Sequence, residues 1–173
     1  MIKKLTLIIG FIICLSSCGK DYVYRIEGEL SNLEDQTVYA VFEKDNYKVV
    51  DTVACTKPGQ FQINQNEAGF HCVTIFFADK EHWVTAYLEP GETVKITGDA
   101  NSPLLLQVKG GRTNDKLTAF KKKLAPLLTE LTNLSNSLNS KDLNDTIEET
   151  DIAARLANVN MQLSEEAIRY VKE

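Results

Sequence analysis

Residues that carry chemistry are scarce in this sequence of 173 residues, which contains two histidines, four cysteines and one tryptophan. His71 and His82 have no further ligand at a recognised metal spacing, and no Cys-x-x-Cys pair occurs. A glycine-rich phosphate loop, a Gly-x-Ser-x-Gly elbow and a His-Glu-x-x-His helix are missing as well. We therefore predict no catalytic residue, no metal site and no cofactor, and we expect that this chain is not an enzyme.

Basic charge is also in deficit, because 19 Lys and Arg residues stand against 24 Asp and Glu residues and the formal net charge is −5. The one basic run, Lys121-Lys122-Lys123, falls in a predicted helix and is interpreted as its solvated face. This balance argues against nucleic acid or an anionic lipid surface as the partner, since both favour clustered Lys and Arg.

An apolar run from Leu5 to Leu15 follows Lys3-Lys4 and is shorter than the roughly 20 residues that span a bilayer. The next residues end in Ser16-Ser17-Cys18, and this segment resembles the bacterial lipobox. The resemblance implies that the Cys18 thiol takes a diacylglyceryl group, that the chain is then cut before Cys18, and that palmitate is among the attached acyl chains. We therefore predict a lipoprotein signal peptide at 1–17 and a lipidated stub at 18–21. The alternative is a plain signal peptide or anchor helix.

Acylation at Cys18 implies a place in the cell envelope of a Gram-negative bacterium, at the outer membrane or the periplasmic face. Acyl chains hold a protein on a membrane by burying methylenes, so the anchor requires no basic patch. Once Cys14 is removed and Cys18 is modified, Cys55 and Cys72 remain. In an oxidising compartment these two can form a disulfide. The alternative is two separate thiols buried in strands.

Residues 22–111 consist of short apolar or alternating runs separated by turn signals such as Pro58-Gly59 and Glu89-Pro90-Gly91-Glu92. About eight strands at spacings of roughly 8–12 residues are typical of an antiparallel β-sandwich or barrel. We predict a mainly β fold with C-terminal α structure. The expected strands are 24–30, 38–42, 49–55, 61–63, 70–77, 83–88, 94–97 and 104–108.

The spacing of apolar residues changes in residues 112–173. There they recur at alternating spacings of three and four, which is the pattern of a helix. Two such stripes predict two helices that fold back as an antiparallel hairpin. Thr113 or Asn114 is expected to cap the first helix, and Asp145 with Glu148 forms a capping box for the second. Pro126 predicts a kink or two helices meeting. The stripes contain Leu117, Phe120, Leu124, Leu127, Leu131, Leu134 and Leu138, and then Ile152, Leu156, Val159, Leu163, Ala167 and Tyr170.

Trp83 and Tyr87 share one face of a predicted strand with Thr85. Large aromatic residues on a strand are often part of the core. If they are exposed instead, they form a ligand platform on which a sugar can stack.

Short motifs follow one another along the mature chain: Tyr-x-Ile-x-Gly at 24–28, Asp51-Thr52-Val53, Gly59-Gln60-Phe61, Leu88-Glu89-Pro90-Gly91, Ile96-Thr97-Gly98-Asp99 and Val108-Lys109-Gly110-Gly111. In this order they resemble the uncharacterised N-terminal β-domain of lipoproteins of the TlpA-like, AhpC/TSA-type thiol–disulfide oxidoreductase family. In such proteins a helical linker and a thioredoxin-like domain follow, and the Cys-x-x-Cys of that domain carries the redox chemistry. This chain has no Cys-x-x-Cys, so the resemblance implies an accessory role only.

The helical pattern continues to Glu173, which fits either a frayed natural terminus or a chain truncated before the thioredoxin-like domain. We expect a lipid-anchored, non-enzymatic accessory or interaction module, with a protein partner or a second copy bound through the helical hairpin. In that case the apolar stripe near 159–171 should stay partly uncovered. The alternative is an anchored glycan- or peptide-binding β-domain that uses Trp83 and Tyr87. A third hypothesis is a redox protein that uses Cys55 and Cys72.

Overall fold

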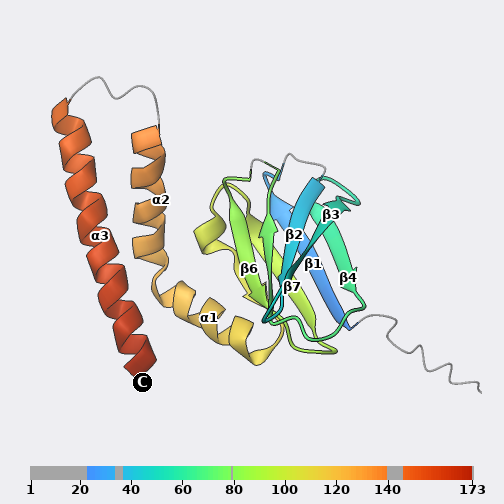
Figure 1. The fold of residues 1–173 in the computed structure, drawn as a ribbon. Helices are drawn as coiled ribbons and strands as arrows, with labels where there is room; N and C mark the ends of the chain where they lie inside the picture. The colour runs from blue at the N-terminus through green and yellow to red at the C-terminus, as the bar shows by residue number, and fades with distance from the viewer. Residues whose placement is uncertain (1–22, 34–36, 79, 140–145, 173) are drawn as a thin grey trace, which may run out of the picture.

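In the part of the chain that the structure describes, eight strands form two four-stranded sheets that pack face to face, and three α-helices follow them (Figure 1). The computed structural model describes residues 23–33, 37–78, 80–139 and 146–172. The predicted mainly β fold with C-terminal helices is confirmed, as a sandwich of two separate sheets rather than a closed barrel. The predicted signal peptide 1–17 and stub 18–21 lie outside the described residues.

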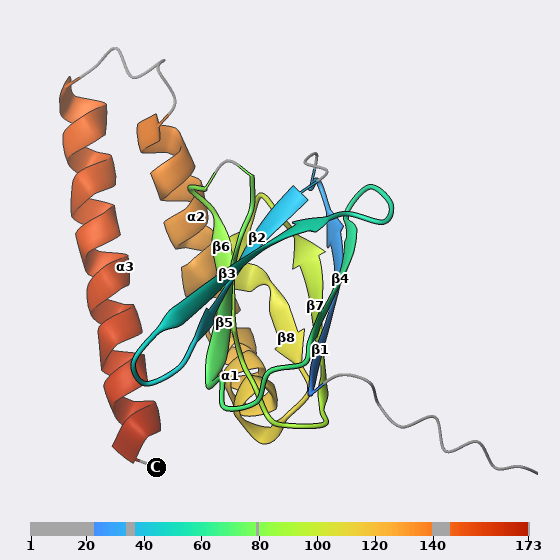
Figure 2. The same cartoon turned by 45° about the vertical axis from the view of Figure 1, so that its right-hand side comes forward.

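Each sheet combines strands that are distant in the sequence (Figure 2). The described strands pair in antiparallel fashion except for β1 and β7, which run parallel. The sheets are therefore mainly antiparallel, as expected, and the β1–β7 pair is an exception that local pattern did not predict. Strands of sheet B lie between β1 and β7 along the chain. Sheet A has the order β4 (Gln60–Gln65), β1 (Tyr24–Ser31), β7 (Thr93–Asp99) and β8 (Gln107–Lys109). Sheet B has the order β3 (Lys48–Ala54), β2 (Thr37–Glu43), β5 (Cys72–Phe76) and β6 (Trp83–Tyr87).

The core lies between the sheets and is built by alternation along each strand. In β2, for example, Val38, Ala40 and Phe42 are fully buried, while the residues between them face outward. Tyr24 of β1 brings a hydroxyl into this core. That hydroxyl donates a hydrogen bond to the carbonyl of Phe70 (3.2 Å) and accepts one from the amide of Gly69 (3.1 Å), so the buried polar group is satisfied.

Helix α1 (Arg112–Lys123) closes the side of the sandwich where sheet A ends in β8 and sheet B ends in β6. Helix α1 contacts the sheets through polar residues. Asn114 and Thr118, at 2% and 6% exposure, are the buried polar residues of the described chain. The Asn114 side chain accepts from the amide of Tyr87 and donates to its carbonyl, both at 2.8 Å. The Thr118 hydroxyl accepts from the amide of Val108 (3.1 Å) and donates to its carbonyl (2.5 Å).

These contacts correct two expectations about α1. The residue that precedes the helix is Gly111 and makes no side-chain cap, whereas Asn114 bonds to β6 and to the carbonyl of Gly110 (2.6 Å). The backbone amide of Thr113 donates instead to the Glu89 carboxylate (3.4 Å). Lys121, expected to be solvated, is half-buried and donates to the carbonyl of Leu106 (2.9 Å), and this burial lowers its pKa.

Of the two outcomes expected at Pro126, the structure has two helices that meet. Helix α1 ends at Lys123, Leu124 separates the helices, and α2 (Ala125–Asn139) begins with Pro126 in its first turn. A proline is tolerated there because the first-turn amides have no partner within the helix. A short 3₁₀ helix, η1 (Pro103–Leu105), lies before β8 and contacts α2.

Helices α2 and α3 (Thr146–Lys172) form the predicted antiparallel hairpin (Figure 1). Its small core is centred on Leu134, Ile152 and Val159, and an ion pair joins Arg155 to Glu130 (3.1 Å). The predicted capping box cannot be placed, since Asp145 and the side chain of Glu148 lie outside the described residues. Within the described helices, no stretch is long and apolar enough to cross a membrane.

Replacing Asn114 should test whether α1 holds the edge of sheet B. The variant Asn114→Ala leaves the peptide groups of Tyr87 without their partner, so we expect the free energy of unfolding to fall by about 1–3 kcal/mol. Urea denaturation measures this change. The exposed Lys122 on the same helix supplies the control, because Lys122→Ala should change stability by about 0.5 kcal/mol or less. Equal effects of the two variants would contradict this role of α1.

Candidate functional site

The outward side chains of sheet B form a continuous surface, here called the outer face of sheet B. Residues directly opposite each other in neighbouring strands point to the same side of a sheet, so the register places them in rows. The rows are Thr52–Tyr39–Phe76–Trp83, then Val50–Val41–Thr74–Thr85, then Lys48–Glu43–Cys72–Tyr87. Two of the three rows contain aromatic residues, and the middle row contains valines and threonines.

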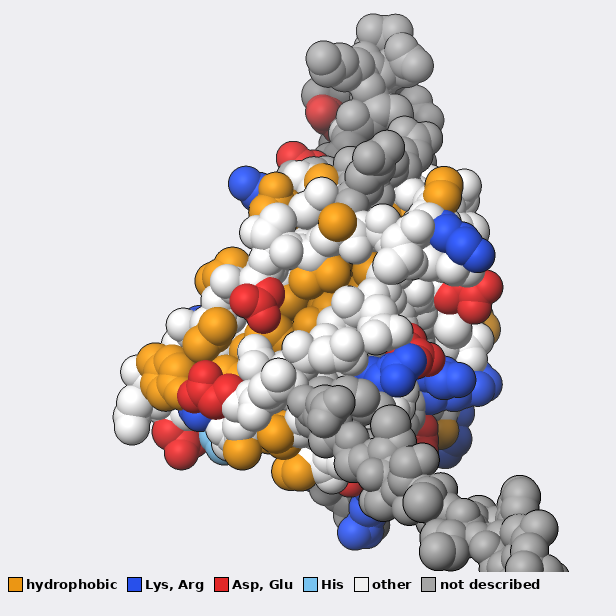
Figure 3. Space-filling view, turned by 90° about the vertical axis from the view of Figure 1, so that its right-hand side faces the viewer, with side chains coloured by type: hydrophobic (Ala, Val, Ile, Leu, Met, Phe, Trp, Pro, Cys, Tyr) orange, Lys and Arg blue, Asp and Glu red, His pale blue; other side chains and the backbone are white. Residues whose placement is uncertain are grey.

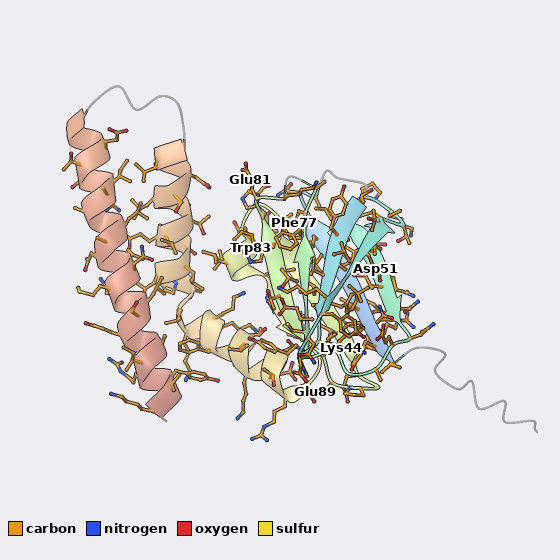
Figure 4. All side chains as sticks on the ribbon, viewed as in Figure 1. Lys44, Asp51, Phe77, Glu81, Trp83 and Glu89 are labelled. Carbon is orange, nitrogen blue, oxygen red and sulfur yellow. The ribbon has the colours of Figure 1, made fainter. Side chains whose placement is uncertain are left out.

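Aromatic and apolar side chains on this outer face are in contact with solvent. Trp83 is 53% exposed, Tyr87 is 41% exposed and Val50 is 63% exposed. The ring of Trp83 lies 6.1 Å from the ring of Phe76, centroid to centroid. Trp83 lies on the side of the sandwich nearer to the helical hairpin (Figure 4). Trp83 and Tyr87 are therefore surface residues and not part of the core between the sheets.

Tyr39 and Phe76, which the sequence analysis did not single out, extend this aromatic surface. Both are half-buried, and the ammonium group of Lys80 lies 5.1 Å from the centroid of the Tyr39 ring. They come from β2 and β5, so only the pairing register brings them beside Trp83. Local sequence patterns do not contain that information.

The third row of the outer face is polar and surrounds a thiol. The Cys72 thiol donates to the carboxylate of Glu43 (3.3 Å), and Lys48 forms an ion pair with the same carboxylate. Burial, reinforced by the neighbouring Glu43 carboxylate, raises the pKa of Cys72 to about 11. Such a thiol is poorly nucleophilic at neutral pH.

No disulfide joins Cys55 and Cys72 in this structure. Cys55 follows Ala54, which pairs with Thr37, and packs against the core. Cys72 lies at the other end of the sheet, where Glu43 pairs with Lys48, and it faces outward. Bridging them would require large backbone movement, so the structure has the two separate thiols and not the disulfide.

A cleft of about 490 Å³ adjoins the outer face where β6, α1 and α3 meet. Tyr87 forms one wall, Tyr170 of α3 forms another, and Arg112 and Lys116 of α1 contribute positive charge. Tyr170 is held by stacking on Phe120, with a centroid distance of 4.2 Å. The cleft therefore combines aromatic surface with two cationic groups, which suits an anionic or hydrogen-bonding ligand.

The two histidines directly precede β5 and β6. His71 contacts the carboxylate of Asp45 (2.7 Å), and the backbone carbonyl of His82 accepts from the amide of Phe77 (2.9 Å). In the part of the chain that the structure describes, no group of three or more His, Cys, Asp or Glu side chains could hold a metal ion.

The side of the sandwich opposite α1 differs in character. There the edge strands are β3 and β4, and hydrophobic side chains are visible in a hollow on this side of the molecule (Figure 3). Val49 and Val53 of β3 are partly buried residues that pack against the main core. We interpret this side of the sandwich as the margin of the core, since these two valines of the edge strand β3 contact the core directly.

A family model described as a domain of unknown function (DUF4369) matches residues 24–117. The matched residues contain all eight strands and the first half of α1, including Asn114. No curated protein and no solved structure matches this chain.

The pKa of Cys72 makes its reactivity depend on pH in a definite direction. The rate of alkylation should rise with pH until about 11, and Glu43→Gln should raise the rate at pH 9 because it removes a carboxylate that disfavours the thiolate. Since the folded state raises this pKa above 9.0, the thiol also contributes stability that is lost as pH rises from about 9 to about 11.

Iodoacetamide labelling followed by mass spectrometry, in a Cys55→Ala background, measures this rate. Glu29→Gln on sheet A serves as the control, because Glu29 lies on the other sheet and should leave the rate unchanged. A Cys72 thiol that labels as fast as a free cysteine at pH 8 would contradict the assigned pKa.

Proposed function

Because the chain belongs to the DUF4369 family, a domain family without an assigned function, we propose its role from its surfaces. We propose that it is a lipid-anchored, non-enzymatic accessory or interaction module of the cell envelope of a Gram-negative bacterium. The anchor would be acylated Cys18, and the domain would act at the outer membrane or the periplasmic face.

The observation that carries this proposal is the exposure of apolar and aromatic side chains on the outer face of sheet B. Antiparallel sheets with one solvated face normally alternate apolar residues inward and polar residues outward. Here Val50 of β3 and Trp83 and Tyr87 of β6 break that pattern on the two edge strands of the sheet. The half-buried outward residues Tyr39, Val41 and Phe76 lie between them on β2 and β5. Contiguous apolar surface of this kind usually marks an interaction site.

The chemistry of the thiols supports a non-enzymatic role. A redox-active thiol works as a thiolate and is exposed and of low pKa. Cys72 has a raised pKa, and Cys55 packs against the core at the far end of the sheet. Within the described residues, Cys55 and Cys72 lie at opposite ends of sheet B, so neither can act as the resolving cysteine of the other.

We further propose a relationship to the N-terminal region of TlpA-like, AhpC/TSA-type oxidoreductases. The resemblance rests on short motifs that fall at strand ends and turns of the sandwich, such as Leu88-Glu89-Pro90-Gly91 after β6 and Gly110-Gly111 before α1. In this proposal the domain positions or recruits a catalytic partner and performs no redox step itself.

A second candidate is an anchored glycan- or peptide-binding domain. It is favoured by the position of Tyr87, which belongs both to the outer face of sheet B and to the wall of the cationic cleft. A chain lying along this face could stack on Trp83 and place an acidic group near Arg112 and Lys116.

The anchor is tested by changing Cys18. The variant Cys18→Ser should lose metabolic palmitate label and move from the membrane fraction to the soluble fraction, because no acyl chain can be attached. Cys55→Ala serves as the control and should keep both the label and the membrane location. If Cys18→Ser stays labelled and membrane-bound, the lipobox interpretation is wrong.

The binding surface is tested at Trp83. A photo-crosslinking residue at this position, in the full chain in its native host, should give defined protein adducts. The same residue at the exposed Gln62 on the outer side of sheet A is the matched control and should give none. Absence of adducts at position 83 would count against the interaction module.

Fluorescence separates the two candidates, because Trp83 is the single tryptophan of the chain. Its emission should resemble that of hydrated indole, given its exposure. A shift on titration with oligosaccharides or acidic peptides would support the glycan- or peptide-binding candidate. An emission that does not respond to either, together with protein adducts at position 83, would favour the interaction module.

A further inference from the structure

Helix α3 carries a second stripe on the face opposite the one that packs on α2. The face toward α2 contains Ile152, Leu156, Val159 and Leu163. At about 100° per residue, another set of residues with alternating spacings of three and four falls on roughly the opposite side of the helix. We call this set the outer stripe: Thr150, Ala154, Ala157, Met161, Ser164, Ile168 and Val171.

Every member of the outer stripe is exposed. Met161 is 55% exposed, Ile168 is 56% exposed and Val171 is 83% exposed. Val159, by contrast, is only 2% exposed and belongs to the core of the hairpin. The stripe that was expected to stay uncovered near 159–171 is packed against α2 at Val159 and Leu163, so that expectation is wrong there. The exposed apolar residues lie on another face of the helix.

We propose that the outer stripe is the surface on which a second copy of this chain packs, with the two α3 helices antiparallel. A spacing of three and four is the pattern of residues that pack along a two-helix seam. From Thr150 to Val171 the stripe covers about 32 Å of helix. With α2 on one face and the second copy on the other, α3 would be the centre of a bundle of two hairpins.

Charge complementarity favours a second copy as the occupant and an antiparallel direction. An antiparallel pairing that sets Met161 against Ser164 of the second copy also brings Asp151 close to Lys172 of the second copy. Symmetry produces this opposite-charge contact twice, as an interface between identical surfaces requires. The ion pairs Arg155–Glu130 and Arg169–Glu166 within the chain are left intact.

A parallel pairing lacks this complementarity. In a parallel pair, Asp151 and Lys172 would face the opposite flank of the outer stripe on the second copy. That flank consists of Ala153, Asn160 and Ala167. Those residues are uncharged and offer no ion pair, although they let the helices approach closely.

Cross-linking in intact cells provides the first test. In the full chain with Cys55→Ala and Cys72→Ala, the variant Met161→Cys should be joined by a short bismaleimide into a product of twice the chain mass. Gln162→Cys is the matched control, because residue 162 is adjacent in sequence but lies off the outer stripe. We expect at least about tenfold more dimer from Met161→Cys, since the proposed register places the two residues 161 on the seam with an offset of about 4.5 Å along the helix axis. Equal yields, or a product containing another protein, would overturn the proposal.

A charge exchange provides the second test, by sedimentation equilibrium of the detergent-solubilised chain. Asp151→Lys alone should weaken the dimer about tenfold, because two attractive contacts become repulsive. Asp151→Lys combined with Lys172→Asp should restore the wild-type dissociation constant to within about twofold. Circular dichroism checks that helix content is unchanged.

A wild-type chain that stays monomeric, or a double variant as weak as the single one, would refute the antiparallel pair. The inference rests on α3 alone and not on the proposed function. Neither experiment measures acylation or binding at Trp83, so the outcomes can be judged separately.

Discussion

The polar face of α1 is the interaction on which the rest of this structure depends. At an edge strand, one side of each peptide unit has no strand partner, and a sandwich has four such edges. Asn114, Thr118 and Lys121, spaced by four and three along one face of the helix, bond to the backbone of β6, β8 and the segment before β8. A helix that docks through apolar residues could cover these groups but could not satisfy them.

This contact also determines where the hairpin projects. Because α1 is hydrogen-bonded to both sheets, its C-terminal end at Lys123 is fixed relative to the sandwich. Leu124 interrupts the helix, and α2 starts after it in a new direction (Figure 1). The stacking of Tyr170 on Phe120 then joins the far end of α3 to α1. The family match to residues 24–117 includes Asn114, so the matched unit contains part of this contact between α1 and the sheets. In physical terms, α1 belongs with the β-domain and not with the hairpin, although the hydrophobic period changes at 111–112.

Much of the fold could be predicted from local pattern. Alternation reports which face of a strand is buried, and the stripe at spacings of three and four reports which face of a helix is buried. That is why the strands, the hairpin and the interruption at Pro126 follow from the sequence. Features that depend on pairing between distant segments could not be predicted in this way. The parallel β1–β7 pair, the burial of Lys121 and the row from Tyr39 to Trp83 each require knowledge of which strands are neighbours.

The outer face of sheet B shows the same limit at the candidate site. Trp83 and Tyr87 have the spacing of one strand face, which is equally compatible with the core and with the surface. In the structure the buried Val84 and Ala86 occupy the inward positions of β6, so Trp83 and Tyr87 point outward. In a strand where both faces carry apolar side chains, local hydrophobicity alone does not identify the inner one.

The two proposed surfaces are compatible in space, and this has a consequence for affinity. The outer stripe belongs to α3, and the outer face of sheet B belongs to the sandwich, so a dimer formed through α3 would leave that face uncovered. Each dimer would then present two copies of a solvent-exposed aromatic surface. Linked sites bind a repeated ligand more tightly than single sites do, because the second binding step becomes intramolecular. A flat face that binds weakly by itself is therefore the kind of surface that gains most from such pairing, and a membrane tether at Cys18 would strengthen the effect by confining both copies to one plane.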